Sequence, residues 1–220
     1  AAVVVVGVVV LGVLVTLLVS WLLSKTLLQG VPSTFTLELP PYRWPKIGTL
    51  LIRSVLDRTL FVLMRAVVVA APAGALIWLL ANLRVGDLSI IGHLAGWLQG
   101  FGHLIGLDGY IILAFILGLP ANEIVIPILI MSYLSEGVMI ELDSIEALRS
   151  LLVANGWTWL TALNMMLFSL LHFPCATTLL TIRKETQSTK WPVLAALIPM
   201  GVAILVCFLL TQLVRLSGLL

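Results

Sequence analysis

The sequence has 220 residues, of which 61% are hydrophobic and only 10% charged, and its formal net charge is +2. Ordinary water-soluble domains carry about 25% charged residues, so this composition, with a mean hydropathy of +1.18, excludes a soluble fold. The small net charge gives no indication of nucleic-acid binding. The composition therefore predicts an integral membrane protein surrounded by the lipid bilayer.

The N-terminal part of the sequence is predicted to be a spanning helix followed by a cytoplasmic connector. Residues 1–23 form an apolar run long enough for the ~30 Å bilayer core, and they lack the basic leader and the cleavage site of a signal peptide. The run opens without a methionine, so we expect the chain to be a fragment of a longer polypeptide or one part of a split one. Residues 24–58 carry four prolines and five basic residues, a bias typical of cytoplasmic loops, and residues 47–58 have the pattern of a helix at the interface. We therefore expect a boundary between 1–58 and a transmembrane domain, 59–220.

The remaining apolar segments complete an all-α membrane protein with about five spanning segments, the later ones being 59–83, 110–134, 157–182 and 191–214. The basic stretch 183–190 predicts a second cytoplasmic loop, whereas the acidic loop 135–156 has no such bias. With those sides fixed, residues 87–134 must cross twice or not at all, so they form a hairpin or a re-entrant loop. Within them, the glycine-rich segment 88–106 is compatible with an interfacial helix, a re-entrant segment or a weak span.

A single carboxylate stands in the stretch "GLPANEIVIPIL", where Glu123 lies between Pro120 and Pro127. Two prolines this close predict an interrupted helix, which is tolerated in a membrane where it faces protein or a water-filled cavity. An ionised carboxylate at mid-bilayer costs about 2.5 to 3.5 kcal/mol, so a cation, a proton or a partner side chain must offset it. We predict a site on a permeation path. A protonated glutamate bonded between helices, or one that reaches water, is the alternative.

A second interruption is predicted in "LLHFPCATTLLTI", where Pro174 and Cys175 follow His172. Paired broken helices often mark the central site of a transporter. Carboxylate, amide, thiolate and imidazole groups together suit a borderline divalent transition metal better than Mg²⁺ or Ca²⁺. The candidate metal ligands are Glu123, Asn122, Cys175 and His172.

Each candidate also has a purely structural interpretation. A free cysteine packs well as a small apolar residue, and His172 can be a hydrogen-bonded structural histidine. Asn164, about three helical turns before Cys175, is expected to point to the same side. We expect His93 and His103 to be interfacial. Cys207, which has no polar neighbour in the sequence, is expected only to pack.

The stretches "GLPANEIVIPILIM" and "LHFPCATTLLTIRKET", with the preceding "FTLELPPYRWP", resemble the C-terminal membrane region of the ferrous iron transport protein B family, including its second gate (nucleoside-recognition-like) domain. The resemblance implies a multi-pass protein that takes up Fe(II), its transported substrate, across the bacterial inner membrane. It places Glu123 and Cys175 on gate-motif positions usually proposed to handle the metal. It also implies a GTPase-containing N-terminal part as partner, because no GxxxxGK[ST] motif, and hence no GTP site, occurs in this chain.

Other functions remain open at this stage. A nucleoside-like small-solute carrier is one alternative, although few aromatic and amide side chains lie near the two breaks. A non-transporting membrane scaffold subunit is another, and a homo-oligomer is compatible with either. An enzyme is disfavoured because no nucleophile, base and orienting group recur at a usable spacing.

Overall fold

The computed structural model describes residues 2–27, 48, 52–53, 59–86, 88–134 and 144–218. The chain divides into two compact units, Ala1–Arg65 and Ala66–Leu220. The predicted interfacial helix 47–58 and most of the connector lie outside the described residues.

The first unit contains α1, Ala2–Thr26, a helix of 25 residues. At 1.5 Å per residue it is about 37 Å long, enough to cross a bilayer core. Valine and leucine cover every side of it, so α1 has no polar face to turn toward water. Near its end the Lys25 ammonium lies 4.2 Å from the centre of the Trp21 ring, a pairing suited to the membrane interface.

A long helix, whose first five residues belong to the first unit, leads into the second unit and is followed by a small β-hairpin. Helix α3, Phe61–Asn82, contains Pro72 without ending there. Strands β1, Arg84–Val85, and β2, Leu88–Ser89, then pair antiparallel with Arg84 opposite Ser89. Ser89 caps α4, Ile90–Leu104, by accepting a hydrogen bond from the Gly92 N–H. The sequence analysis did not predict this β-hairpin.

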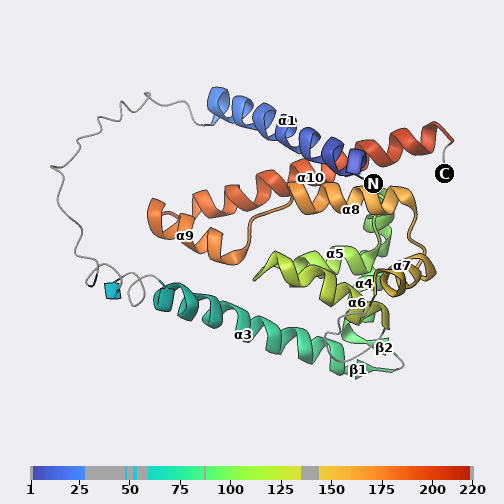
Figure 1. Ribbon diagram of the computed structural model, residues 1–220, viewed down its shortest axis with the longest axis horizontal. Coiled ribbons are helices and arrows are strands. Elements are labelled where there is room, and N and C mark those ends of the chain that lie inside the picture. Colours follow the sequence, from blue (N-terminus) through green and yellow to red (C-terminus); the bar gives the residue numbers. More distant parts are fainter. Residues whose placement is uncertain are drawn as a thin grey trace. The chain divides into compact units, whose positions relative to one another are not determined.

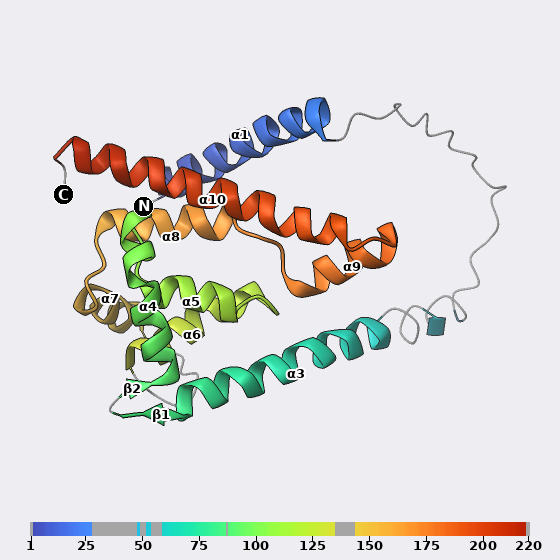
Figure 2. The ribbon, with the colours of Figure 1, turned by 180° about the vertical axis from the view of Figure 1, so that it is seen from behind.

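Helix α4 and helix α5, Gly109–Leu117, meet at a bend of 111° (Figure 2). Asp108 caps α5 through its Oδ1, which accepts from the Ile111 N–H at 2.7 Å. After a turn and the short 3₁₀ helix η2, Asn122–Ile124, helix α6, Val125–Leu134, runs back beside α5. The Tyr110 and Tyr133 rings, at the open ends of the two helices, lie 5.5 Å apart. This segment is therefore a helical hairpin, and the single helix expected to span over 110–134 is not present.

The second half of the unit is a broken helix paired with an unbroken one. Helix α7, Ile145–Ala154, occupies part of the predicted acidic loop and is capped by Ser144. It leads to α8, Trp159–Leu171, then α9, Ala176–Thr186, and α10, Lys190–Leu216. Figure 1 shows α10 running alongside α8 and α9 in the opposite direction. The α9–α10 turn and the α7–α8 junction therefore lie at opposite ends of this helix pair.

The core of the unit lies where the hairpin packs on α8. Phe115 of α5 and Phe168 of α8 are both buried, with their ring centres 4.7 Å apart. Behind them α8 and α10 are joined by two buried polar residues, since Asn164 Nδ2 donates to Thr211 Oγ1 at 2.8 Å.

The all-α membrane fold predicted from composition is confirmed. Four helical segments of the described residues are long and apolar enough to cross a membrane: α1, α3, α8 taken together with α9, and α10. A fifth is obtained if α4 and α5 count as one bent span. Residues 110–134 were predicted to span the membrane because their apolar length is that of a spanning helix. In the structure the two halves of this segment pair with each other instead.

Candidate functional site

The first helix break forms the tip of the helical hairpin. Helix α5 ends at Leu117 and the chain turns through Gly118–Ala121, with the Ala121 N–H donating to the Gly118 carbonyl at 3.0 Å. Pro120, which has no N–H, falls inside this turn. Pro127 is the third residue of α6, where a missing N–H leaves no hydrogen bond unmade. Pro120 therefore marks the interruption, and Pro127 starts the return helix.

The second break separates α8 from α9. His172 has extended backbone angles, φ −70° and ψ −179°, directly after Leu171. Pro174 follows, and Cys175 has an extended backbone at the N-cap of α9. Residues before a proline avoid the helical region, so a local steric effect ends α8 here.

The two breaks touch each other. The Ala176 N–H donates to the Leu119 carbonyl at 2.8 Å. The N–H at the start of α9 and the carbonyl at the hairpin tip both lack a partner within their own helix, and this bond pairs them with each other. Pro120 and Cys175 are the sequence neighbours of these two atoms. The shared hydrogen bond therefore brings together backbone segments that are far apart in the sequence.

His172 is held in one orientation by its backbone and by aromatic rings. Its Nδ1 lies 2.8 Å from the Ser169 carbonyl, which can only accept, so Nδ1 carries the proton. In the neutral ring, Nε2 then has a free lone pair, and this atom is buried without a hydrogen-bond partner. Phe115 and Phe173 surround the ring, with centres 4.9 and 5.1 Å away. A histidine held through one ring nitrogen, with a lone pair left on the other, has the orientation of metal-binding histidines.

Cys175 is partly exposed and lies among hydroxyl groups. Its Sγ is 3.1 Å from Thr177 Oγ1 and 3.3 Å from Thr178 Oγ1. Hydroxyls can donate to a thiolate, and α9 points its N-terminal dipole toward the same residue. These surroundings suit a thiolate ligand better than an apolar packing role.

Asn122 and Glu123 lie on η2 at the hairpin tip, and both side chains are exposed. Among the described residues, no group of three or more His, Cys, Asp or Glu side chains is close enough to hold a metal ion. The four candidate ligands thus lie on two adjoining breaks and do not form a compact ligand cage, and their joint role stays a prediction.

Two sequence interpretations need correction. The expected direction of Asn164 assumed one continuous helix to Cys175, but α8 ends at Leu171, and Asn164 bonds Thr211 on α10. Cys207 was predicted to have no polar neighbour, yet its Sγ donates to the Asn164 carbonyl at 3.6 Å. The first error arises because α8 ends before Cys175, and the second because the hydrogen-bond acceptor of Cys207 lies on another helix.

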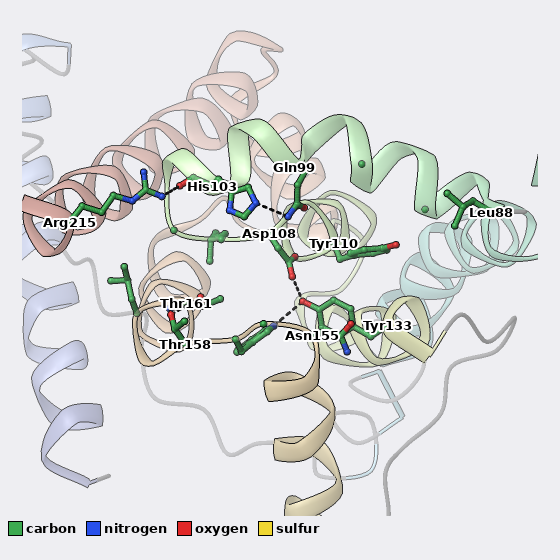
Figure 3. A pocket seen from close by; sticks show the side chains of 17 residues that line it. Leu88, Gln99, His103, Asp108, Tyr110, Tyr133, Asn155, Thr158, Thr161 and Arg215 are labelled. Carbon is green, nitrogen blue, oxygen red and sulfur yellow. Dashed lines mark hydrogen bonds between the residues drawn. The ribbon is translucent and has the colours of Figure 1, made fainter. Parts of the chain in front are cut away.

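The sequence also missed a cavity of about 630 Å³ at the opposite end of α8 (Figure 3). There the Trp157 indole N–H donates to the Tyr133 hydroxyl at 2.8 Å, and that hydroxyl donates to Asp108 Oδ2. The sequence does contain one feature that indicates this cavity. Gly92 and Gly96 are four residues apart, so they leave space on one face of α4.

Comparison with known proteins gives two family matches that follow each other along the chain. Residues 5–57 match the family model "Ferrous iron transport protein B C terminus", and residues 63–189 match "Nucleoside recognition", also called Gate. No solved structure matches the chain.

Curated relatives named "Fe(2+) transporter FeoB" match most of the chain. The protein of Staphylococcus aureus (strain MSSA476) is 32% identical over 213 residues, which is 92% of this chain and 30% of that protein. The protein of Leptospira biflexa is 27% identical over 94% of this chain and 32% of its own length. The protein of Methanocaldococcus jannaschii is 25% identical over 91% of this chain. The chain therefore spans about a third of the length of these relatives.

Proposed function

Since the chain belongs to the ferrous iron transport protein B family and carries its Gate (nucleoside recognition) domain, we propose that it is a membrane permease module for Fe(II) uptake. The module acts in the bacterial inner membrane together with a GTPase-containing N-terminal part. Support comes from the relatives named as Fe(2+) transporters, which share the Gate region. The second support is structural: the two helix breaks, which carry the candidate metal ligands, are in contact.

The hydrogen bond from Ala176 to Leu119 carries this proposal. A hydrated cation loses several kcal/mol of solvation on leaving water, and only groups already placed inside the protein can replace that loss. Broken helices supply such groups as free carbonyl oxygens and helix ends. Because this bond joins the two breaks, it supports a single passage that the surrounding donor groups would line.

The donor set favours Fe(II) over hard cations. Cys175 offers sulfur, His172 offers an unbonded ring nitrogen, and Asn122 and Glu123 offer oxygen. Soft and borderline ligands of this kind select transition metals over Mg²⁺ and Ca²⁺. In the proposed mechanism the Glu123 carboxylate attracts the cation to the tip, and Cys175 and His172 replace water as it passes the breaks.

The proposal includes an arrangement in the membrane. The connector within 1–58 and the basic turn 183–190 lie on the cytoplasmic side, and 59–220 is the gate-type domain. The junction of α7 and α8 then lies on the outer side, because α8 and α9 together cross the membrane between it and the basic turn.

Uptake of radioactive Fe(II) tests the function in cells that lack other iron importers. The variant Glu123→Gln keeps the size and hydrogen bonding of the side chain but removes its charge. We expect Fe(II) uptake by the assembled transporter to fall at least tenfold at matched membrane expression. The matched control is Glu185→Gln, which removes a carboxylate from the exposed end of α9 and should leave uptake near wild type. Uptake that survives Glu123→Gln while the folded protein becomes unstable would make Glu123 structural.

A further inference from the structure

The cavity at the α7–α8 junction is built from five helices of the second unit. Its wall combines the α4–α5 bend, the ends of α6 and α10, and the start of α8 (Figure 3). With a volume of about 630 Å³ it lies within the usual range for binding sites, ~300 to 1,000 Å³. It lies at the end of the α8–α10 pair opposite the basic α9–α10 turn.

Absent side chains on α4 keep the cavity open. Gly96 faces it, and a Cβ placed there would meet nothing within 4 Å. One helical turn further, Gln99 fixes the wall: its Oε1 accepts from the Gly109 N–H at 2.8 Å, and its Nε2 lies 3.0 Å from His103 Nε2. Arg215 holds the rim by donating to the His103 carbonyl at 2.6 Å. The space is therefore maintained by a hydrogen-bonded frame.

Asp108, Thr158 and Thr161 supply oxygen atoms to the polar part of the cavity wall. Asp108 is the one carboxylate among the described lining residues. Thr158 and Thr161 place their hydroxyls 3.2 Å apart on the opposite wall. Arg215 is directed at the His103 carbonyl at the rim, and the oxygen ligands for a positive ion and its water are those of Asp108, Thr158 and Thr161.

Below the cavity, α8 carries two buried polar atoms with no partner. They are Asn164 Oδ1 and His172 Nε2, and among the described residues no other buried side-chain nitrogen or oxygen lacks a hydrogen bond. Asn164 is fully buried, with 0% of its surface exposed. Buried polar groups are normally satisfied, so two exceptions on one helix require an explanation.

These atoms lie on the same face of α8 as the cavity. Thr161, Asn164, Phe168 and His172 follow a spacing of three, four and four residues, which places them along one side of a helix. Thr161 lines the cavity, and His172 lies at the break about 16 Å further along the axis. Both unpartnered atoms are acceptors when His172 is neutral. A line of acceptors without donors suits a cation or its water, and does not suit an anion.

We propose that the cavity is the outer vestibule for a hydrated divalent cation, and that the cation reaches the two breaks along this face of α8. Asn164 Oδ1 then replaces a water ligand below the vestibule, and the Phe115–Phe168 ring pair forms the constriction above His172. The proposal rests on the proposed Fe(II) function. It adds a second polar site and a route that links it to the breaks.

Cysteine labelling tests the vestibule without using iron transport. In intact cells, Thr161→Cys should react with a membrane-impermeant cationic thiosulfonate added outside, and millimolar Mn²⁺ should slow the reaction at least fivefold. The neighbouring Ala162→Cys, about 100° around the helix, should stay unreactive. The wild-type protein measures the background labelling of its own cysteines, Cys175 and Cys207. No outside labelling of Thr161→Cys would overturn the vestibule. Protection by uridine but not by Mn²⁺ would identify an organic solute site and would also overturn it.

Uptake measurements test the route. Asn164→Leu removes the unpartnered acceptor and should lower Fe(II) uptake at least tenfold, whereas Asn164→Asp keeps an acceptor oxygen and should retain uptake. Thr211→Val removes the hydrogen-bond partner of Asn164 and leaves the acceptor, so it should stay within twofold of wild type. Equal uptake by Asn164→Leu and Thr211→Val would overturn the route. A wild-type transporter that takes up no Fe(II), while Mn²⁺ still protects Thr161→Cys, would refute the iron function and leave the vestibule standing.

Discussion

Replacing Gly109 by alanine should separate α4 from α5. A Cβ on Gly109 would lie 1.9 Å from the Ala95 carbonyl oxygen, although real Cβ contacts below 3.0 Å are essentially never found. The two backbones must therefore move apart by about 1 Å, which stretches the hydrogen bond from the Gly109 N–H to Gln99 Oε1. Overpacking costs about 1 to 3 kcal/mol, and a weakened hydrogen bond adds about 0.5 to 1.5 kcal/mol.

We expect Gly109→Ala to lower the free energy of unfolding by about 2 to 4 kcal/mol. The assay is reversible unfolding of the purified protein by sodium dodecyl sulfate in mixed micelles. Gly100→Ala is the matched control, because it adds the same methyl group to α4, the helix that Gly109 packs against, with nothing within 4 Å of the added methyl group. It should change stability by no more than about 1 kcal/mol. Equal unfolding curves for Gly109→Ala and Gly100→Ala would refute the close contact at the bend.

Three further changes have expected outcomes. Tyr133→Phe removes the donor to Asp108 Oδ2 and the acceptor of the Trp157 indole N–H, and should cost about 1 to 3 kcal/mol in the same unfolding assay. Tyr110→Phe keeps the ring contact and should cost less; equal losses would show that the Tyr133 hydroxyl is not structural. Cysteines introduced at Ser188 and Asn155 should be labelled from opposite faces of the membrane, and labelling from one face would contradict the assigned direction of α8 and α9. Cys175→Ser should reduce the preference for Fe(II) over Mg²⁺ in competition uptake, because a hydroxyl is a harder ligand than a thiolate, and an unchanged preference would remove sulfur from the selective step.

The membrane fold and the breaks could be predicted because their causes are local. Apolar length predicts α1 and α10, and the missing N–H of Pro120 and the restraint before Pro174 interrupt helices wherever those residues occur. Whether the chain continues in the same direction after a break or turns back depends on the residues that the two halves of the broken helix contact. The contact between Tyr110 and Tyr133 closes residues 110–134 into a hairpin. A hydropathy profile cannot predict a contact between two particular residues.

The polar cluster between α8 and α10 could not be found from sequence spacing. Asn164 and Thr211 are 47 residues apart and meet only because two helices pack side by side. Cys207 looks isolated in the sequence for the same reason, since its polar contact is 43 residues away. Asp108 and Tyr133 likewise join across 25 residues. The candidate ligands at the breaks were accessible to sequence reasoning because prolines mark them.

X-ray absorption spectroscopy at the iron edge tests the central claim most directly. The claim is that Fe(II) passes between the two breaks, where Cys175 supplies its sulfur ligand. Fe(II) bound to the assembled transporter should show a mixed shell of nitrogen, oxygen and one sulfur at ~2.3 Å, a distance typical of metal–thiolate bonds. The sulfur should disappear in Cys175→Ser and persist in Cys207→Ala, because Cys207 is fully buried between α8 and α10. A shell without sulfur in the wild type, or sulfur that persists in Cys175→Ser, would contradict the account.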